Sequence, residues 1–305
     1  MTEATELEYG AASVDFICIG AQKSGTTYIT SALHAHPEVQ LYGNKETYFF
    51  SSKGEYQTRD DGAHSNAHRG IDWYKGLFLN DSRKKGEVST HYILDPRSAR
   101  KIKQAFPDIR LFAILRNPID RAFSQYNMER FKTVKESRSL MTIIKKEPNN
   151  EILARGLYFK QLTPFVQEFP GDQLRIFLFD DILDNPGKLF FELFKHIGVD
   201  TSVVPPGINK RMNKSGVAKY PLIPRSVRFV RQTLENLGLS SVIRGLTKIG
   251  VAQAYLNFHN RYNKKAADYE MTMEERAALQ AYYADDIELL ERMINRDLSH
   301  WKAKQ

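Results

Sequence analysis

The sequence predicts an α/β fold of three layers, in which helices cover both faces of a central, mainly parallel sheet and further helices follow at the C-terminal end. Two observations predict this class. Short, nearly continuous apolar segments alternate along the chain with segments of helical periodicity. The apolar segments also lack the polar alternation of a strand with one face in water, so both faces of the sheet are expected to be buried.

Three strand–turn–helix units carry the prediction. The units are a strand at 14–19 with a helix at 26–35, a strand at 110–115 with a helix ending near 131, and a strand at 174–179 with a helix at about 186–196. Glycine or polar residues separate each strand from its helix. This repetition is typical of parallel strands joined by helical crossovers.

The remaining segments are expected to complete a single domain over residues 1–305. Residues 1–13 are interpreted as a flexible tail, while 53–70 and 132–150 are interpreted as lids or surface excursions. The segment 221–270 is interpreted as a basic helical excursion within this domain. A last helix is predicted at 272–297, where Thr272 and Glu275 have the spacing of a capping box.

Composition limits the functional classes. With 42% hydrophobic and 26% charged residues, the 305-residue chain is neither disordered nor collagen-like. Its single cysteine, Cys18, is expected to pack in the core, and we expect a reducing, cytoplasmic location. No secretory signal or membrane span is expected, because no suitable apolar run occurs. The formal charge of +8 favours an anionic partner.

The turn at 20–27 has the features of a phosphate cradle. It follows a buried strand and opens a helix, so free backbone N–H groups and the positive helix end point to one place. Gly20 and Gly25 allow close backbone approach, Lys23 supplies a cation, and Thr26 and Thr27 supply hydroxyl donors. The alternative is a tight turn that binds nothing. A Walker A loop would place a lysine directly after the second glycine, where this chain has Thr26.

A second anion site is predicted where the strand at 110–115 ends. Asn117 is a suitable helix cap, Pro118 suits the first turn, and Arg116 precedes them with a side chain that can bind phosphate in bidentate fashion. Ser124 shares a helix face with the cap but lies roughly 10 Å further along the axis. The alternatives are a structural salt bridge for Arg116 and a solvated or backbone-bonded hydroxyl for Ser124.

Together, segments 22–27 and 116–124 resemble the two nucleotide-binding signatures of sulfotransferases that use 3′-phosphoadenosine 5′-phosphosulfate (PAPS). Further segments resemble the heparan-sulfate-type branch of that family and its bacterial relatives. They are 44–50, Gly86-Glu87 with Tyr92, Gly156 with Tyr158, and 297–301. The resemblance extends from about Asp15 to Trp301.

The resemblance implies roles for the residues of the donor site. Lys23 and the backbone of Ser24, Gly25, Thr26 and Thr27 would hold the 5′-phosphosulfate, and Arg116 with Ser124 would bind the 3′-phosphate. Tyr158 is expected either to line the nucleotide or acceptor cleft or to pack in the core. The segment Lys214-Ser215-Gly216 resembles a late loop by which relatives close over the 3′-phosphate.

For the proton acceptor, Glu46 matches the acidic residue that heparan-type enzymes use as general base. Partial burial is expected to raise its pKa. One departure is Val88, since heparan-type enzymes have a lysine after the residue that matches Glu87. His91 lies close by in sequence and is a candidate second base or substrate contact, with a packed or surface histidine as the alternative.

The resulting hypothesis is an enzyme, a PAPS-dependent sulfotransferase. It would move the sulfuryl group in line to a hydroxyl or amine of a carbohydrate or glycosylated metabolite, leaving adenosine 3′,5′-bisphosphate (PAP), and it would use no metal and no nucleic acid. One alternative is a P-loop-type nucleotide kinase or ATPase. The other is a non-enzymatic protein that binds polyanions or a membrane surface through the basic region 221–250. The oligomeric state does not follow from the sequence.

Overall fold

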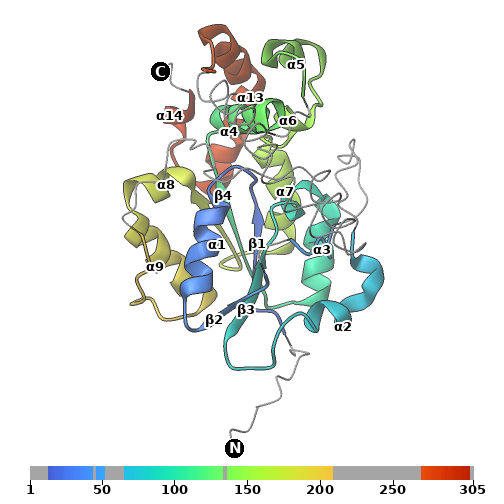
Figure 1. Ribbon diagram of the computed structural model, residues 1–305, viewed down its shortest axis with the longest axis vertical. Coiled ribbons are helices and arrows are strands. Elements are labelled where there is room, and N and C mark those ends of the chain that lie inside the picture. Colours follow the sequence, from blue (N-terminus) through green and yellow to red (C-terminus); the bar gives the residue numbers. More distant parts are fainter. Residues whose placement is uncertain (1–12, 44–45, 52–64, 133–135, 209–268, 303–305) are drawn as a thin grey trace, which may run out of the picture.

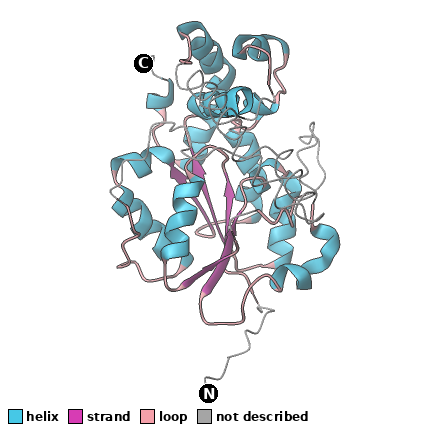
Figure 2. Cartoon of the chain, in the orientation of Figure 1, coloured by secondary structure: helices cyan, strands magenta, loops and turns pink. Residues whose placement is uncertain are grey.

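The structure is a computed structural model that describes residues 13–43, 46–51, 65–132, 136–208 and 269–302. These residues build a five-stranded sheet of order β2-β3-β1-β4-β5, in which every neighbouring pair is parallel. The strands are β1 (Phe16–Gly20), β2 (Val39–Leu41), β3 (Lys84–Val88), β4 (Arg110–Leu115) and β5 (Leu174–Leu178). Helices flank the sheet on both sides in Figures 1 and 2, which confirms the predicted three-layer class.

In chain order, the described residues form eleven α-helices. They are α1 (Thr26–Ala35), α2 (Gly70–Lys75), α3 (Pro96–Ala105), α4 (Pro118–Asn127), α5 (Leu140–Lys146), α6 (Glu151–Ala154), α7 (Tyr158–Glu168), α8 (Phe179–Asp184), α9 (Pro186–Ile197), α13 (Met273–Ile294) and α14 (Ser299–Lys302). Short 3₁₀ helices occupy Ala67–Arg69 and Tyr92–Leu94, and a π-helical turn, Met128–Lys132, continues α4.

Alternate residues of the central strands serve two separate cores. Phe16 and Cys18 of β1 point to the face that α1 and α9 cover, whereas Ile17 and Ile19 point to the face that α3, α7 and α13 cover. All four side chains are fully buried. Because the strands are parallel, their carboxyl ends lie at one edge of the sheet. The turns after β1, β3 and β4 lie at this edge.

Most predicted elements are confirmed. The helix at 26–35 and the strand at 110–115 have the predicted bounds, and the capping box of α13 is formed, with Thr272 Oγ1 accepting from the Glu275 N–H at 3.1 Å. The second helix consists of α4 and the π-helical turn that continues it to Lys132, which agrees with the predicted end near 131. The segment 132–150, interpreted as a lid or surface excursion, contains α5.

The sequence pattern missed β3, which pairs with β1 on one side and β2 on the other. Its residues read Lys-Lys-Gly-Glu-Val, so no apolar run marks it. The buried Lys85 ammonium is satisfied by the carbonyl oxygens of Asp81 and Arg83, at 2.6 and 3.0 Å. The Lys84 ammonium donates to Asp15 Oδ1 at 3.0 Å, so both lysines of the strand have partners.

Several predicted segments lie outside the described residues. These are most of the tail at 1–13, most of the loop at 53–70 and most of the predicted basic excursion at 221–270, including its proposed membrane-contacting part at 221–250. Among the described helices, none combines the length and the apolar composition needed to cross a bilayer.

Candidate active site

The turn after β1 presents backbone donors at the start of α1. Lys23 and Gly25 adopt positive φ angles of 70° and 86°, so the chain bends sharply on either side of Ser24. Gly25 caps α1 without any side-chain hydrogen bond, and the first turn of the helix carries no acidic residue. The backbone N–H groups and the positive end of the helix are therefore available to bind an anion.

Ser24 lies at the centre of this turn and is fully buried. Its hydroxyl has no hydrogen-bond partner of ordinary geometry among the described residues. It lies close enough to the Tyr158 hydroxyl to offset part of the rise that burial causes in the pKa of Tyr158. A buried hydroxyl that lacks a hydrogen bond of ordinary geometry is typical of a turn that binds a polar ligand.

Arg116 follows β4 and reaches back to the same turn. Its Nη1 donates to the Lys23 carbonyl oxygen at 3.3 Å, and its guanidinium lies 4.9 Å from the ring centroid of Phe179. It forms no salt bridge within the described part of the chain, so the structural salt bridge is not found there. Burial lowers the pKa of Arg116, since a charged guanidinium loses hydration in this place. The two predicted anion sites therefore adjoin one another.

The start of α4 has the predicted cap, with the Asn117 Oδ1 accepting from the Ile119 N–H at 3.0 Å and Pro118 in the first turn. Ser124 is half-buried on α4. No hydrogen bond joins Ser124 to Arg116 within the described residues. Their shared binding of a phosphate stays a prediction.

Tyr158 is fully buried at the start of α7. Its hydroxyl donates to the Arg116 carbonyl oxygen at 3.0 Å. The ring thus supports the backbone that carries the guanidinium. Direct contact between Tyr158 and a nucleotide stays a prediction.

Lys23 and Gln22 are held from two further elements. The Lys23 Nζ lies 3.8 Å from Met128 Sδ, in the π-helical turn that ends α4. Arg155 Nη1 donates to Gln22 Oε1 at 2.8 Å, and its Nη2 donates to Glu151 Oε2 at 2.9 Å. The tethers of Lys23 and Gln22 could not be inferred from the sequence, because each joins residues more than 100 positions apart.

Glu46 contacts His91, which lies in the segment that follows β3. The Nδ1 of His91 hydrogen-bonds to Oε2 of Glu46, and Thr90 donates to Oε1 at 2.6 Å. The imidazole packs against Tyr48, with 4.9 Å between ring centroids. Both side chains keep about a fifth of their surface exposed, 19% for His91 and 21% for Glu46. The pair is therefore ordered and open to solvent.

The expected rise in the pKa of Glu46 is wrong. Burial does push the value upward, but the hydrogen bonds from His91 and Thr90 and the charge of a protonated His91 outweigh it, so the pKa of Glu46 lies below its usual range. Thr90, which the sequence analysis did not single out, contributes to this result. The two oxygens of Glu46 are already engaged, whereas no described residue hydrogen-bonds to the Nε2 of His91.

The C-terminal segment closes the end of β5 next to Arg116. Trp301 is almost fully buried, and its indole N–H donates to Asp180 Oδ2 at 3.1 Å. The backbone oxygen of Trp301 accepts from Asn117 Nδ2 at 3.4 Å. Phe179, missed by the sequence analysis, packs beneath both Arg116 and Gly25.

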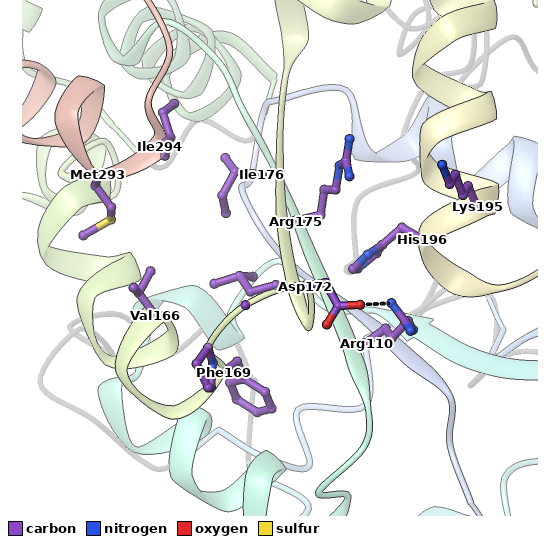
Figure 3. A pocket seen from close by; sticks show the side chains of 13 residues that line it. Arg110, Val166, Phe169, Asp172, Arg175, Ile176, Lys195, His196, Met293 and Ile294 are labelled. Carbon is purple, nitrogen blue, oxygen red and sulfur yellow. Dashed lines mark hydrogen bonds and ion pairs between the residues drawn. The ribbon is translucent and has the colours of Figure 1, made fainter.

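A separate pocket of about 680 Å³ lies at the opposite end of the sheet, where β4 and β5 begin (Figure 3). Arg110 and Asp172 form an ion pair of 3.2 Å at this pocket. Ligands of open parallel sheets bind at the carboxyl ends of the strands, and this pocket is at the amino ends. It is therefore distinct from the site around Lys23.

Lys214, Ser215 and Gly216, the predicted closing loop, lie outside the described residues. Within the described ranges, no group of three or more His, Cys, Asp and Glu side chains is arranged to hold a metal ion. Whether the reaction uses a metal is not decided by this, and a reaction without one stays a prediction.

A strand-to-helix turn with free backbone donors, an adjoining arginine and a carboxylate–imidazole pair at one sheet edge are typical of enzymes that transfer a group from a nucleotide. Comparison with known proteins gives the family. The sulfotransferase domain family matches residues 13–232, which is most of the chain. The chain therefore belongs to the sulfotransferase family.

Individual relatives agree with this assignment. A membrane-associated sulfotransferase of Dictyostelium discoideum is 31% identical over 118 residues, covering 37% of this chain and 22% of that protein. The human bifunctional heparan sulfate N-deacetylase/N-sulfotransferase 2 is 27% identical over 199 residues, covering 60% of this chain and 22% of that protein. This chain thus spans about a fifth of the length of these curated relatives.

Among solved structures, a sulfotransferase from Alicyclobacillus acidocaldarius superimposes with a TM-score of 0.67 at 25% identity. The match covers 96% of this chain and 100% of the other. The likeness extends over the sheet and its helices together, which agrees with the predicted fold of the family.

Proposed function

We propose that this sulfotransferase moves the sulfuryl group of PAPS to a hydroxyl or amine of a carbohydrate acceptor. The contact between Arg116 and the Lys23 carbonyl oxygen carries the proposal, because it brings two anion-binding motifs together at adjacent strand ends. The relatives that act on heparan sulfate support a glycan as the acceptor class. A glycosylated metabolite fits the same chemistry.

The donor would be held at both of its anionic ends. Lys23 and the backbone N–H groups of Ser24 to Thr27 fit the 5′-phosphosulfate, since the start of α1 has no side-chain cap of its own. Arg116 and Ser124 are the residues for the 3′-phosphate. The charge of Arg116, which burial leaves poorly hydrated, gains most from an anion at this place.

For the proton, we infer that Glu46 and His91 act as a pair. The Glu46 carboxylate accepts a hydrogen bond from the Nδ1–H of His91. The lone pair of Nε2, which is directed away from Glu46, is then the base. A carboxylate whose pKa lies below its usual range is a weak base by itself, but it is well suited to orient an imidazole.

In the proposed step, the acceptor oxygen or nitrogen bonds to sulfur as the bond from sulfur to the 5′-phosphate oxygen breaks. The acceptor proton passes to His91 Nε2. Lys23 and the amides of the turn neutralise the charge that develops on the departing phosphate oxygen. Positioning and fixed donors thus supply the rate enhancement, with no covalent intermediate on the protein.

The test measures transfer of labelled sulfate from PAPS to a panel of oligosaccharides with free hydroxyl or amine groups, and to simple phenols as a comparison. We expect transfer to the sugars. His91→Asn keeps a hydrogen-bonding group near Glu46 but lacks the base, so its kcat should fall about 100-fold or more, with PAP affinity unchanged. A kcat within twofold of wild type in this variant would mean that Glu46, and not His91, is the base. Transfer to phenols alone would contradict a glycan acceptor.

The remaining predictions about the environment stay open. A cytoplasmic location, predicted from the single cysteine, has no structural test here. Contact with a membrane surface was assigned to residues 221–250, which lie outside the described residues.

A further inference from the structure

Glu87 is a buried carboxyl group that the proposed mechanism does not use. It is the fourth residue of β3, lies opposite Ile17 of β1 and keeps only 1% of its surface exposed. Neither oxygen makes a hydrogen bond of ordinary geometry, and no ion pair reaches it from the described residues. Such a group is stable inside a protein only when its surroundings favour the uncharged form.

Three hydroxyl groups face the Glu87 carboxyl, from Thr47, Tyr74 and Tyr92. The Thr47 and Tyr92 hydroxyls also hydrogen-bond to each other at 2.8 Å. Tyr74, on α2, is fully buried, and its hydroxyl has no other hydrogen-bond partner among the described residues. Glu87 thus lies where β3, α2, the segment at 46–51 and the 3₁₀ helix after β3 converge.

Two of these residues are chain neighbours of the catalytic pair. Thr47 directly follows Glu46, and Tyr92 directly follows His91. In both segments one residue faces the site and the next faces Glu87. The backbone of Thr47 is fixed further by its carbonyl oxygen, which accepts from Asn66 Nδ2 at 2.7 Å.

We propose that Glu87 is a positioning residue for sulfuryl transfer, whose carboxyl holds Thr47 and Tyr92 and thereby fixes Glu46 and His91 against each other. The proposal rests on the proposed role of that pair. It adds a residue that touches neither the donor nor the acceptor and acts only through the two segments.

The arrangement makes the positioning sensitive to pH. Burial raises the pKa of Glu87 to about 7, the charge of Glu46 adds to the rise, and the three hydroxyls offset part of it. Below that value the carboxyl is neutral and can both donate and accept. Above it, a second negative charge lies beside Glu46 and repels it, while Lys85, two positions before Glu87 on the same strand, is engaged by Asp81 and Arg83. The pair should therefore lose alignment as pH rises through about 7.

The experiment compares wild type with Glu87→Gln, which keeps the neutral shape at every pH. The readout is the ratio of the variant kcat to the wild-type kcat between pH 5.5 and 8.5. We expect a ratio within threefold of one below pH 6 and a rise of at least fivefold above pH 7.5, with PAP affinity unchanged. Glu168→Gln, which alters a half-buried residue at the end of α7 that pairs with Arg100, should give a constant ratio.

A ratio for Glu87→Gln that stays constant with pH would overturn the proposal. Should this variant fail to fold, Tyr92→Phe gives the second measurement, since it removes one hydroxyl that faces Glu87. We expect its kcat to fall at least fivefold with unchanged PAP affinity, and an unchanged kcat would equally overturn the proposal. Wild type is assayed first: absence of transfer by wild type contradicts the proposed function itself, whereas normal transfer with unaffected variants contradicts only the role of Glu87.

Discussion

At Gly25, two physical requirements meet in one residue. The backbone has φ of 86°, and a Cβ atom built there would lie 3.0 Å from the ring of Phe179. The same ring packs under Arg116, so a shift of Phe179 would disturb both anion-binding motifs. In the proposed donor site, Gly25 would therefore act through its lack of a side chain as well as through its backbone N–H.

Gly25→Ala should weaken nucleotide binding as well as lower stability. The matched control is Gly171→Ala, because Gly171 has φ of 69° but nothing within 4 Å of a Cβ. Both variants carry backbone strain of about 1 kcal/mol, and only the first displaces Phe179. Calorimetry with PAP should show roughly a tenfold weaker Kd for Gly25→Ala and the wild-type Kd for Gly171→Ala. Equal affinities in both variants would contradict this account of the turn.

Among the elements, α13 illustrates a helix whose local sequence and tertiary role agree. Leu279, Tyr283, Ile287 and Leu290 are buried along one side of it, and Tyr283 donates to the Leu153 carbonyl oxygen at 2.8 Å. Its start is fixed by the reciprocal bonds between Thr272 and Glu275. The helix covers one face of the sheet but supplies no residue of the proposed site.

Thr272→Ala should therefore affect stability and leave chemistry unchanged. Loss of the cap costs about 1 kcal/mol, which corresponds to a fall of roughly 2 °C in the midpoint of thermal unfolding for a chain of this size. Thr272→Ser keeps the hydroxyl and should retain the wild-type midpoint. The kcat of the folded Thr272→Ala enzyme should equal that of wild type; a lowered kcat would mean that α13 acts on the site.

There are physical reasons why β2 and β3 could not be predicted from the sequence. Three of the five residues of β3 are charged, so its pattern does not indicate a buried strand. β2 has only three residues, too few for any periodicity. By contrast, β1, β4 and β5 carry apolar runs that end at the turns of the site, and these three were predicted.

At the scale of the whole molecule, the sheet explains which parts of the site could be predicted. Lys23 and Arg116 each follow an apolar strand, so their positions at neighbouring strand ends could be inferred from the sequence. The contact between Glu46 and His91 could not be inferred, since it joins residues 45 positions apart through β3. Thr90 and Phe179 were missed because neither residue type indicates a site without its neighbours in space.

In the proposed mechanism, one nucleotide is bound at both ends, by the turn at Lys23 and by Arg116. Isothermal calorimetry with PAP and with adenosine 5′-phosphate tests this binding mode, because the two ligands differ only in the 3′-phosphate. We predict that PAP binds about 10- to 100-fold more tightly, that Arg116→Ala removes this preference, and that Arg175→Ala, on the edge strand β5, retains it. Equal affinity for the two nucleotides, or a preference that survives Arg116→Ala, would contradict the account.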